Sequence, residues 1–416
     1  MSELRYRHPD EATAPKPDHP QQRDSPRQPD QRITRPDHDA ARSYDADADF
    51  KRPVPKPDDY LPDDTGGTEP SDAELRDHRS WVKDHADIAD LTPGRDPAQA
   101  PRLREVAEGD HTDTLTAVVD RPDFHDPTDN RSPDRYGDPL TRPDGTRVPC
   151  LDGPPRREET RQGWAGDCGI IAALGAVAAH KPEEIARRIQ PQDDGTYKVT
   201  LSEARRSESG VSEPTGREIA FSITPQLPVR DEDPGTPACA KIEDGTSWCA
   251  VMEKAFAGID QTWSTERRIS WLGDWAGMCA QDQASNAENP RSGPAPSGYA
   301  RLHQGTSPWE RAEALTQLTG QSAEVREFPA GREEWRINRI IRSQLDDGKP
   351  ILVGARKQTH ERELLPHGLK DSHMYEVIGV QKGKILLRNP WNEEHPEPME
   401  TDEFARNMSR YYSTLT

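Results

Sequence analysis

The sequence predicts an α+β protein in which a helix-rich lobe precedes a sheet-rich lobe, both behind a long arm without a packed core. Three observations predict this order. Residues 1–140 carry few aliphatic side chains, the chain after residue 155 has apolar side chains at helical spacing, and the final part changes to short alternating runs. The arm is 1–140 and the folded domain 141–416, with the helical lobe at about 155–300 and the sheet lobe at about 301–416.

The composition limits the kinds of partner that we expect. Hydrophobic residues make up 31% of the chain, against roughly 45–50% in ordinary globular proteins. The formal charge of −20 argues against capture of a phosphate backbone, so nucleic acid is not an expected partner. Five cysteines without a CxxC pair suggest neither a disulfide framework nor a zinc site, and they favour a reducing compartment; they are Cys150, Cys168, Cys239, Cys249 and Cys279.

The arm repeats Pro-Asp, Arg-Pro and Asp-His pairs, which cannot bury enough apolar surface to offset the entropy of ordering, so we expect disorder. Two patches, 73–91 and 103–119, have enough apolar periodicity for isolated helices. The acidic run before Phe50 imitates a calcium loop, but Phe50 and Lys56 replace its glycine and its glutamate. No metal ligands are assigned. No apolar run is long enough to span a bilayer, and no Sec-type signal is recognised.

The helical lobe begins with a strongly apolar helix. Asp167 is a good N-cap, and Ile170, Ile171, Leu174 and Val177 follow at spacings of three and four. Strands are expected at 193–201 and 217–229, and helices at 247–259, 309–320 and 332–348. The polar stretch 205–218 is expected to be a flexible loop.

The sheet lobe is predicted from three β-rich runs, 349–356, 373–381 and 384–391. The last two are separated by Lys382-Gly383, a hairpin signal. Since the two strands of a hairpin are antiparallel, the start of the first lies beside the end of the second. His373 and Asn389 should therefore lie at the same end of the sheet.

These residues suggest nucleophilic catalysis. Cys168 stands in the first turn of a helix, where the dipole and free N–H groups favour the thiolate, and a thiol nucleophile also needs a base and an orienting group. His373 and Asn389 supply both. Taken singly, Cys168 reads as a buried structural cysteine, His373 as a surface or capping residue, and Asn389 as part of an Asn-Pro turn.

The motifs QGWAGDC, DGTY, WCAVMEKAF, HMYEVIGV and LRNPW occur in one order between residues 155 and 416. In this respect the chain resembles the protease core of the calpains, and the resemblance implies a two-lobed papain-like fold. It also implies a cysteine nucleophile at Cys168, a base at His373, an orienting residue at Asn389, an oxyanion donor at Gln162 and a shielding ring at Trp391. The cycle would start from a Cys168 thiolate and a protonated His373.

The chain departs from the calpain pattern at two positions. Gly169 stands where calpains usually have tryptophan, and Ser372 where they usually have glycine. We expect these changes to alter substrate preference more than catalysis. The resemblance leaves calcium open as a cofactor, because no ligand motif can be transferred to this sequence.

The resulting hypothesis is a calpain-like cysteine endopeptidase acting on protein substrates. Two alternatives remain open: a deamidase or acyltransferase that uses the same three residues, and an inactive protease fold that serves as an interaction module. Two biological settings fit the peptidase hypothesis. The protein is either an intracellular regulatory protease in the cytoplasm, or an effector or toxin exported by a specialised, non-Sec secretion apparatus. An effector would have an inhibitor or immunity protein as a partner.

Overall fold

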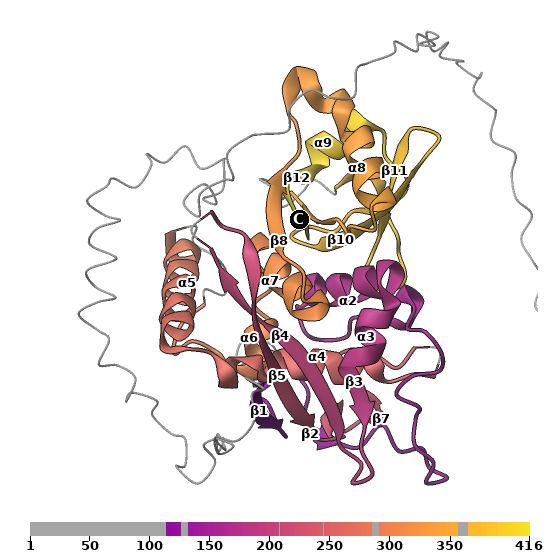
Figure 1. Ribbon diagram of the computed structural model, residues 1–416, viewed down its shortest axis with the longest axis vertical. Coiled ribbons are helices and arrows are strands. Elements are labelled where there is room, and N and C mark those ends of the chain that lie inside the picture. Colours follow the sequence, from indigo (N-terminus) through magenta and orange to yellow (C-terminus); the bar gives the residue numbers. More distant parts are fainter. Residues whose placement is uncertain (1–113, 126–131, 208, 244, 285–290, 357–364) are drawn as a thin grey trace, which may run out of the picture. The chain divides into compact units, whose positions relative to one another are not determined.

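The computed structural model describes residues 114–125, 132–207, 209–243, 245–284, 291–356 and 365–416 (Figure 1). The predicted arm up to residue 113, with its helix at 73–91, lies outside these residues. Within them, helices and a mainly antiparallel sheet are combined, so the α+β prediction is confirmed. None of the described helices has the length and apolar character needed to cross a bilayer.

The main sheet runs in the order β11-β10-β9-β12-β8-β5-β4-β3, and β1 pairs in parallel with β5. One residue pair, Ser212 with Ala323, joins β5 to β8. A smaller sheet has the order β2-β6-β7. The strands are β1 (Thr114–Val119), β2 (Arg135–Gly137), β3 (Ile189–Pro191), β4 (Tyr197–Arg206), β5 (Ser212–Ile223), β6 (Leu227–Arg230), β7 (Asp233–Pro237), β8 (Ala323–Glu327), β9 (Leu352–Ala355), β10 (Met374–Gln381), β11 (Lys384–Arg388) and β12 (Met408–Leu415).

Strand β1 corrects the predicted boundary near residue 140. Its sequence, TLTAVV, is rich in the β-branched residues threonine and valine, and the strand pairs with β5 instead of ending the helix expected at 103–119. Val119 is fully buried and packs where Gly258 has no side chain: a Cβ there would lie 2.4 Å from a Val119 methyl carbon. The packed domain therefore includes residues that composition alone assigned to the arm.

The expectation of a flexible loop at 205–218 is also wrong. Strand β4 continues to Arg206 and β5 begins at Ser212, so most of this polar stretch is paired backbone. Arg217 and Glu203 form an ion pair across the two strands. Polar side chains misled the prediction because the outer part of this hairpin faces solvent, where strands need no apolar face.

The helices predicted at 247–259 and 309–320 are confirmed as α4 and α7, and the apolar helix after Asp167 is α2. The predicted helix at 332–348 is divided into η6 and α8. The helical elements are η4 (Arg157–Glu159), α2 (Cys168–His180), α3 (Pro182–Arg188), α4 (Trp248–Gly258), η5 (Ile259–Thr262), α5 (Thr265–Ala284), α6 (Gly298–Leu302), α7 (Pro308–Thr319), η6 (Gly331–Arg336), α8 (Ile337–Asp346), η7 (Pro366–Gly368) and α9 (Thr401–Asn407).

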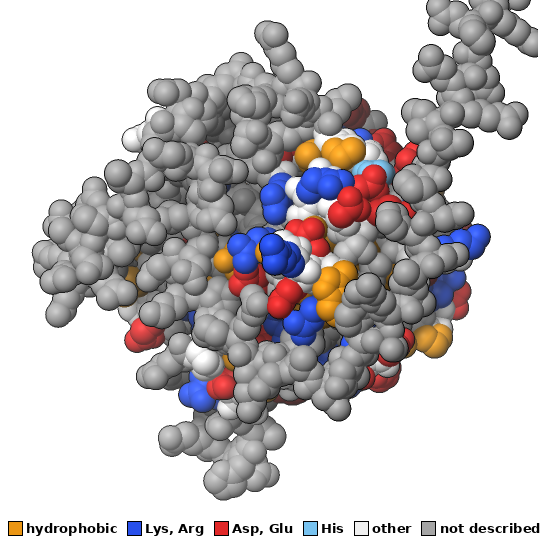
Figure 2. Space-filling model, turned by 90° about the horizontal axis from the view of Figure 1, so that it is seen from above, with side chains coloured by type: hydrophobic (Ala, Val, Ile, Leu, Met, Phe, Trp, Pro, Cys, Tyr) orange, Lys and Arg blue, Asp and Glu red, His pale blue; other side chains and the backbone are white. Residues whose placement is uncertain are grey.

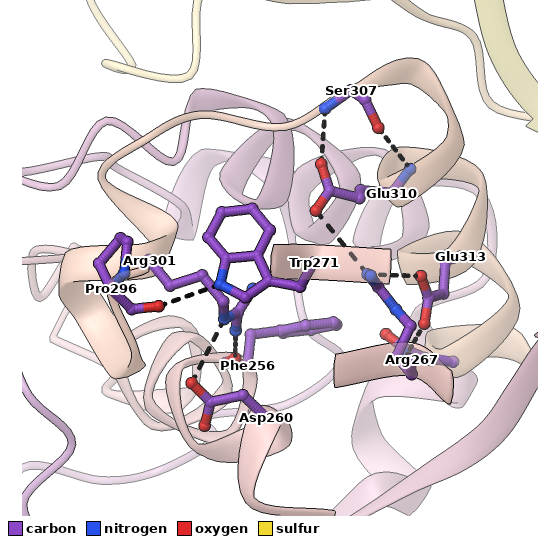
Figure 3. A network of polar contacts seen from close by, with 10 residues as sticks. Phe256, Asp260, Arg267, Trp271, Pro296, Arg301, Ser307, Glu310 and Glu313 are labelled. Carbon is purple, nitrogen blue, oxygen red and sulfur yellow. Dashed lines mark hydrogen bonds and ion pairs between the residues drawn. The ribbon is translucent and has the colours of Figure 1, made fainter. Parts of the chain in front are cut away.

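Helix α5 was not predicted, and its position depends on tertiary contacts (Figure 3). Arg267 of α5 pairs with Glu313 of α7 at 3.3 Å, and Glu310 also forms the capping box of α7 with Ser307. The Trp271 indole N–H donates to the Pro296 carbonyl at 3.1 Å. The ion pair anchors α5 to α7, which packs on α2, and the indole hydrogen bond anchors α5 to the segment before α6.

The described core is divided between two hydrophobic clusters. One surrounds α2, α4 and α7, and the other is formed by α8, β9, β10, β11, β12 and α9. At the β10–β11 turn, Lys382 and Gly383 have φ of 51° and 83°, which confirms the predicted Lys-Gly hairpin. Figure 2 shows acidic and basic side chains interspersed on the described part of one face, and exposed ion pairs of this kind contribute little to stability.

Candidate active site

Cys168 is the first residue of α2 and is 7% exposed. The chain reaches it through a short loop that is fixed at both ends by backbone hydrogen bonds: Gln162 N–H donates to Pro390 O at 2.9 Å, and Trp164 N–H donates to Ala238 O at 2.7 Å. Glycine is required in this loop, because a Cβ at Gly163 would lie 1.8 Å from the Cys239 carbonyl oxygen. The thiol is therefore presented at the start of a rigid, buried helix.

His373 and Asn389 lie where the hairpin prediction expected them. His373 immediately precedes β10, Asn389 immediately follows β11, and the register pairs Glu376 with Arg388. The Nε2 atom of His373 lies 2.8 Å from Oδ1 of Asn389. Because Asn389 Oδ1 can only accept, Nε2 carries the proton and Nδ1 is the basic nitrogen.

Cys168 is linked to the start of β10 through the residue that follows His373. The backbone N–H of Met374, the residue after His373, donates to the Cys168 sulfur. Helix α2, which begins at Cys168, packs against β10, which His373 immediately precedes. Trp391 lies on the other side of the imidazole, with 4.7 Å between ring centroids.

Burial controls the protonation of the two residues more strongly than the helix terminus does. Desolvation raises the pKa of Cys168 to about 11, although the Met374 N–H opposes the shift. Desolvation also lowers the pKa of His373, against the hydrogen bond to Asn389. Both shifts favour a neutral thiol and a neutral imidazole. The expected resting pair of thiolate and imidazolium is therefore disfavoured before substrate binds.

Gln162 lies beside this centre but does not point wholly toward it. Its side-chain Nε2 donates to Ala165 O at 2.6 Å, which uses one of its two N–H groups. Its Oε1 is buried without a hydrogen-bond partner.

The structure explains one of the two departures from the calpain pattern, the one at Gly169. A Cβ on Gly169 would lie 2.0 Å from Thr306 Oγ1 and 3.1 Å from the Arg311 side chain. The segment before α7 therefore fills the space that a side chain after the nucleophile would need. Ser372 has φ of 51°, in the left-handed region that favours glycine.

Replacing Ser372 by glycine is expected to relieve this backbone strain. Ser372→Gly should raise the free energy of unfolding by up to about 1 kcal/mol, since the left-handed region costs a non-glycine residue about that much. Urea denaturation measures the change. Ser409→Gly, in strand β12, is the matched control and should lower stability, because glycine weakens a strand interior. A loss of stability in both variants would contradict the strain at Ser372.

Sequence reasoning missed two features near the centre. Trp164 stacks on His303 with 4.5 Å between ring centroids, and Nδ1 of His303 accepts from Gly166 N–H at 3.1 Å. Asp167, expected to cap α2, makes no side-chain capping bond and instead faces Glu253 of α4. A signal existed for the second feature: Glu253 lies, next to Lys254, within the largely apolar run of α4.

A calcium or other metal centre gains no support from the described residues. Among them, no group of three His, Cys, Asp or Glu side chains is placed to hold an ion. We therefore assign no ligands, and the chemistry below uses none.

No protein-family model matches this chain, and no curated protein matches it significantly in sequence.

Proposed function

We propose that this chain is a cysteine endopeptidase of papain-like, calpain-related architecture. The observation that carries the proposal is the 2.8 Å contact between His373 Nε2 and Asn389 Oδ1, next to a cysteine at the start of a buried helix. An imidazole held in one tautomer, with its basic nitrogen free, is what a thiol nucleophile requires. The motifs shared with calpains assign these residues the same three roles.

The reaction begins with proton transfer from the Cys168 thiol to Nδ1 of His373. The sulfur attacks the peptide carbonyl carbon, and the oxyanion accepts hydrogen bonds from the Cys168 backbone N–H and from Nε2 of Gln162. His373 then gives its proton to the leaving nitrogen as the C–N bond breaks, leaving a thioester. Water, deprotonated by His373, attacks the thioester, releasing the carboxylate product and the thiol.

Asn389 and Trp391 keep the imidazole in position during this cycle. Oδ1 of Asn389 also accepts from Trp391 N–H at 3.0 Å, and Nδ2 donates to Glu394 O at 3.3 Å. Asn389 is fully buried, and the indole of Trp391 packs on His373. The hydrogen bond that orients His373 is thus protected from competing water.

Product analysis tests the reaction type. The wild type is incubated with casein and with a free amine, and the products are sequenced by mass spectrometry. New amino termini support peptide hydrolysis. Conversion of glutamine to glutamate, or incorporation of the amine, would instead support the deamidase or acyltransferase alternative. A thiol-directed electrophile that fails to label Cys168, together with unchanged casein, would favour the inactive interaction module.

Gln162 should contribute to rate more than to binding. We expect Gln162→Ala to lower kcat by roughly 10²–10³-fold with a small change in KM, since an oxyanion donor acts mainly in the transition state. Steady-state cleavage of a peptide substrate measures both constants. Gln192→Ala removes an exposed amide and should change neither. An equal loss of kcat in both variants would contradict the assignment of Gln162 to the oxyanion site.

The biological setting is a separate proposal. Expression of an exported effector in foreign cells should be toxic, and Cys168→Ala should remove that toxicity. Active but harmless protein would favour the intracellular regulatory protease instead.

A further inference from the structure

A pair of buried carboxyl groups lies next to Cys168, one on the residue before it and one on helix α4. The reaction above does not use this pair. Asp167 and Glu253 are both fully buried, and the two side chains are within hydrogen-bonding reach of each other. Glu253 also accepts the backbone N–H of Ala240, at 3.0 and 2.9 Å for its two oxygens. Neither oxygen of Asp167 has a donor from the rest of the described protein.

Two carboxylates cannot hydrogen-bond to each other, because each can only accept. The groups that face the pair offer little compensation. Cys239, Cys249 and Tyr299 are buried and their pKa values are raised well above the ordinary range, so they are neutral. Lys241 is the cation that acts on Glu253, but its Nζ is directed to Pro237 O at 2.6 Å.

A proton would supply the missing donor. Desolvation raises the pKa of Asp167 to about 7, and desolvation together with the neighbouring Asp167 raises that of Glu253. When two carboxyl groups share a buried site, repulsion between their negative charges raises the pKa of one of them, so that it keeps its proton. The short distance between the two carboxyl groups and the lack of another donor for Asp167 thus both indicate a shared proton.

We propose that Asp167 and Glu253 share a proton in the folded protein, and that this acid pair is a positioning unit for Cys168. The second half rests on the proposed peptidase function. Asp167 precedes the nucleophile, and its carbonyl accepts the N–H groups of Ile170 and Ile171 at 2.8 and 3.1 Å. A side chain fixed to α4 through the shared proton therefore fixes the first turn of α2.

Glu253→Gln tests the shared proton without removing the contact. The amide oxygen can still accept from Ala240, and the amide N–H can donate to Asp167. The infrared absorption of protonated carboxyl groups at neutral pH should fall in Glu253→Gln and in Asp167→Asn by the contribution of one group, while the contribution of the buried Glu376 remains. Glu232→Gln, at an exposed turn, should leave the absorption unchanged. Equal absorption in Glu253→Gln and this control would overturn the shared proton.

Proton linkage to folding gives an independent reading. The folded pair holds a proton that the unfolded chain, with ordinary carboxyl pKa values near 4, releases at neutral pH. Stability therefore falls as pH rises toward the folded pKa, by about tenfold in the folding equilibrium constant per pH unit for one proton. Urea denaturation of Glu253→Gln should show a slope smaller by one proton. An unchanged slope would overturn the proposal.

The positioning role is read from Cys168 labelling by iodoacetamide in a Cys279→Ala background, at neutral and alkaline pH. The rate at which Cys168 is labelled in Glu253→Gln should stay within about threefold of the parent's rate at neutral pH. In Glu253→Ala this labelling rate should fall by more than about tenfold. At alkaline pH the shared proton is lost, so the labelling rate of Cys168 in the parent should fall below the rate in Glu253→Gln. Equal profiles would overturn the positioning role. Labelling needs no proteolysis, so failure of the peptidase proposal on casein is a separate result.

Discussion

Cys168→Ala is expected to lower casein cleavage by roughly 10⁴-fold or more, because removing the nucleophile of a catalytic set costs nearly the whole covalent pathway. The fold should be unaffected, since the change removes one sulfur atom from a site already at the helix terminus. Initial rates on casein and on a peptide substrate measure the loss. Far-ultraviolet circular dichroism and the urea midpoint verify that the variant is folded.

Cys279→Ala is the matched control for this experiment. Cys279 lies on α5 and is partly exposed, whereas the other four cysteines are buried, so it is the cysteine whose side chain is most open to a thiol reagent. The control should keep full activity and lose only background labelling. Equal activity in Cys168→Ala and the wild type would end the cysteine peptidase proposal, whatever the labelling pattern.

Arg388→Met is expected to lower the free energy of unfolding by about 3–5 kcal/mol, the usual cost of removing one partner from a buried ionic network. Arg388 is 3% exposed. Its Nη2 donates to Arg157 O at 2.7 Å and to Thr160 O at 2.8 Å, and Arg157 pairs with Glu376 at 2.9 Å. The guanidinium therefore ties β11 to the segment before the nucleophile.

This network depends on a small residue in α2. A Cβ on Gly175 would lie 2.9 Å from Nη1 of Arg388, so glycine leaves room for the guanidinium against the helix. Burial raises the pKa of Glu376 to about 7, while Arg157 and Arg388 oppose that shift. Loss of Arg388 removes part of the compensation and leaves Glu376 more dependent on Arg157.

Urea denaturation of two further variants makes the test specific. Arg406→Met breaks an exposed pair with Asp402, 3.0 Å apart, and should cost no more than about 0.5 kcal/mol. The double variant Arg388→Met, Glu376→Met should recover part of the stability, because apolar replacement of both partners removes the desolvation cost. An Arg388→Met cost as small as that of Arg406→Met would contradict the network.

Much of the fold follows from local patterns. Glycine at 320, with φ of 67°, ends α7 as the sequence predicts, and the Lys382-Gly383 turn joins β10 to β11. The hairpin places the start of β10 beside the end of β11, so His373 and Asn389 share an end of the sheet, although a bulge between Val377 and Gly379 shifts the register by one residue. Short-range signals were sufficient here because turn and cap geometry depends on neighbours in the sequence.

Other elements could not be predicted from local patterns. Strand β1 was assigned to a helix because TLTAVV acquires its β conformation by pairing with residues 218–223 of β5. Helix α5 has a weak apolar stripe and is held by Arg267 and by the Trp271 contact to Pro296. Both depend on partners distant in sequence.

The sequence by itself determined the α+β class and predicted which residues make up the candidate catalytic set, but the order of a helix-rich and a sheet-rich lobe is not seen, because β3–β7 lie in the part expected to be helical. Only the tertiary structure decided the electrostatics of this set. A helix N-terminus favours a thiolate, but complete packing around α2 excludes water, and desolvation then raises the Cys168 pKa. The same packing turned Asp167 from an expected cap into one half of a buried carboxyl pair. Burial depends on the whole fold, so no local pattern carries it.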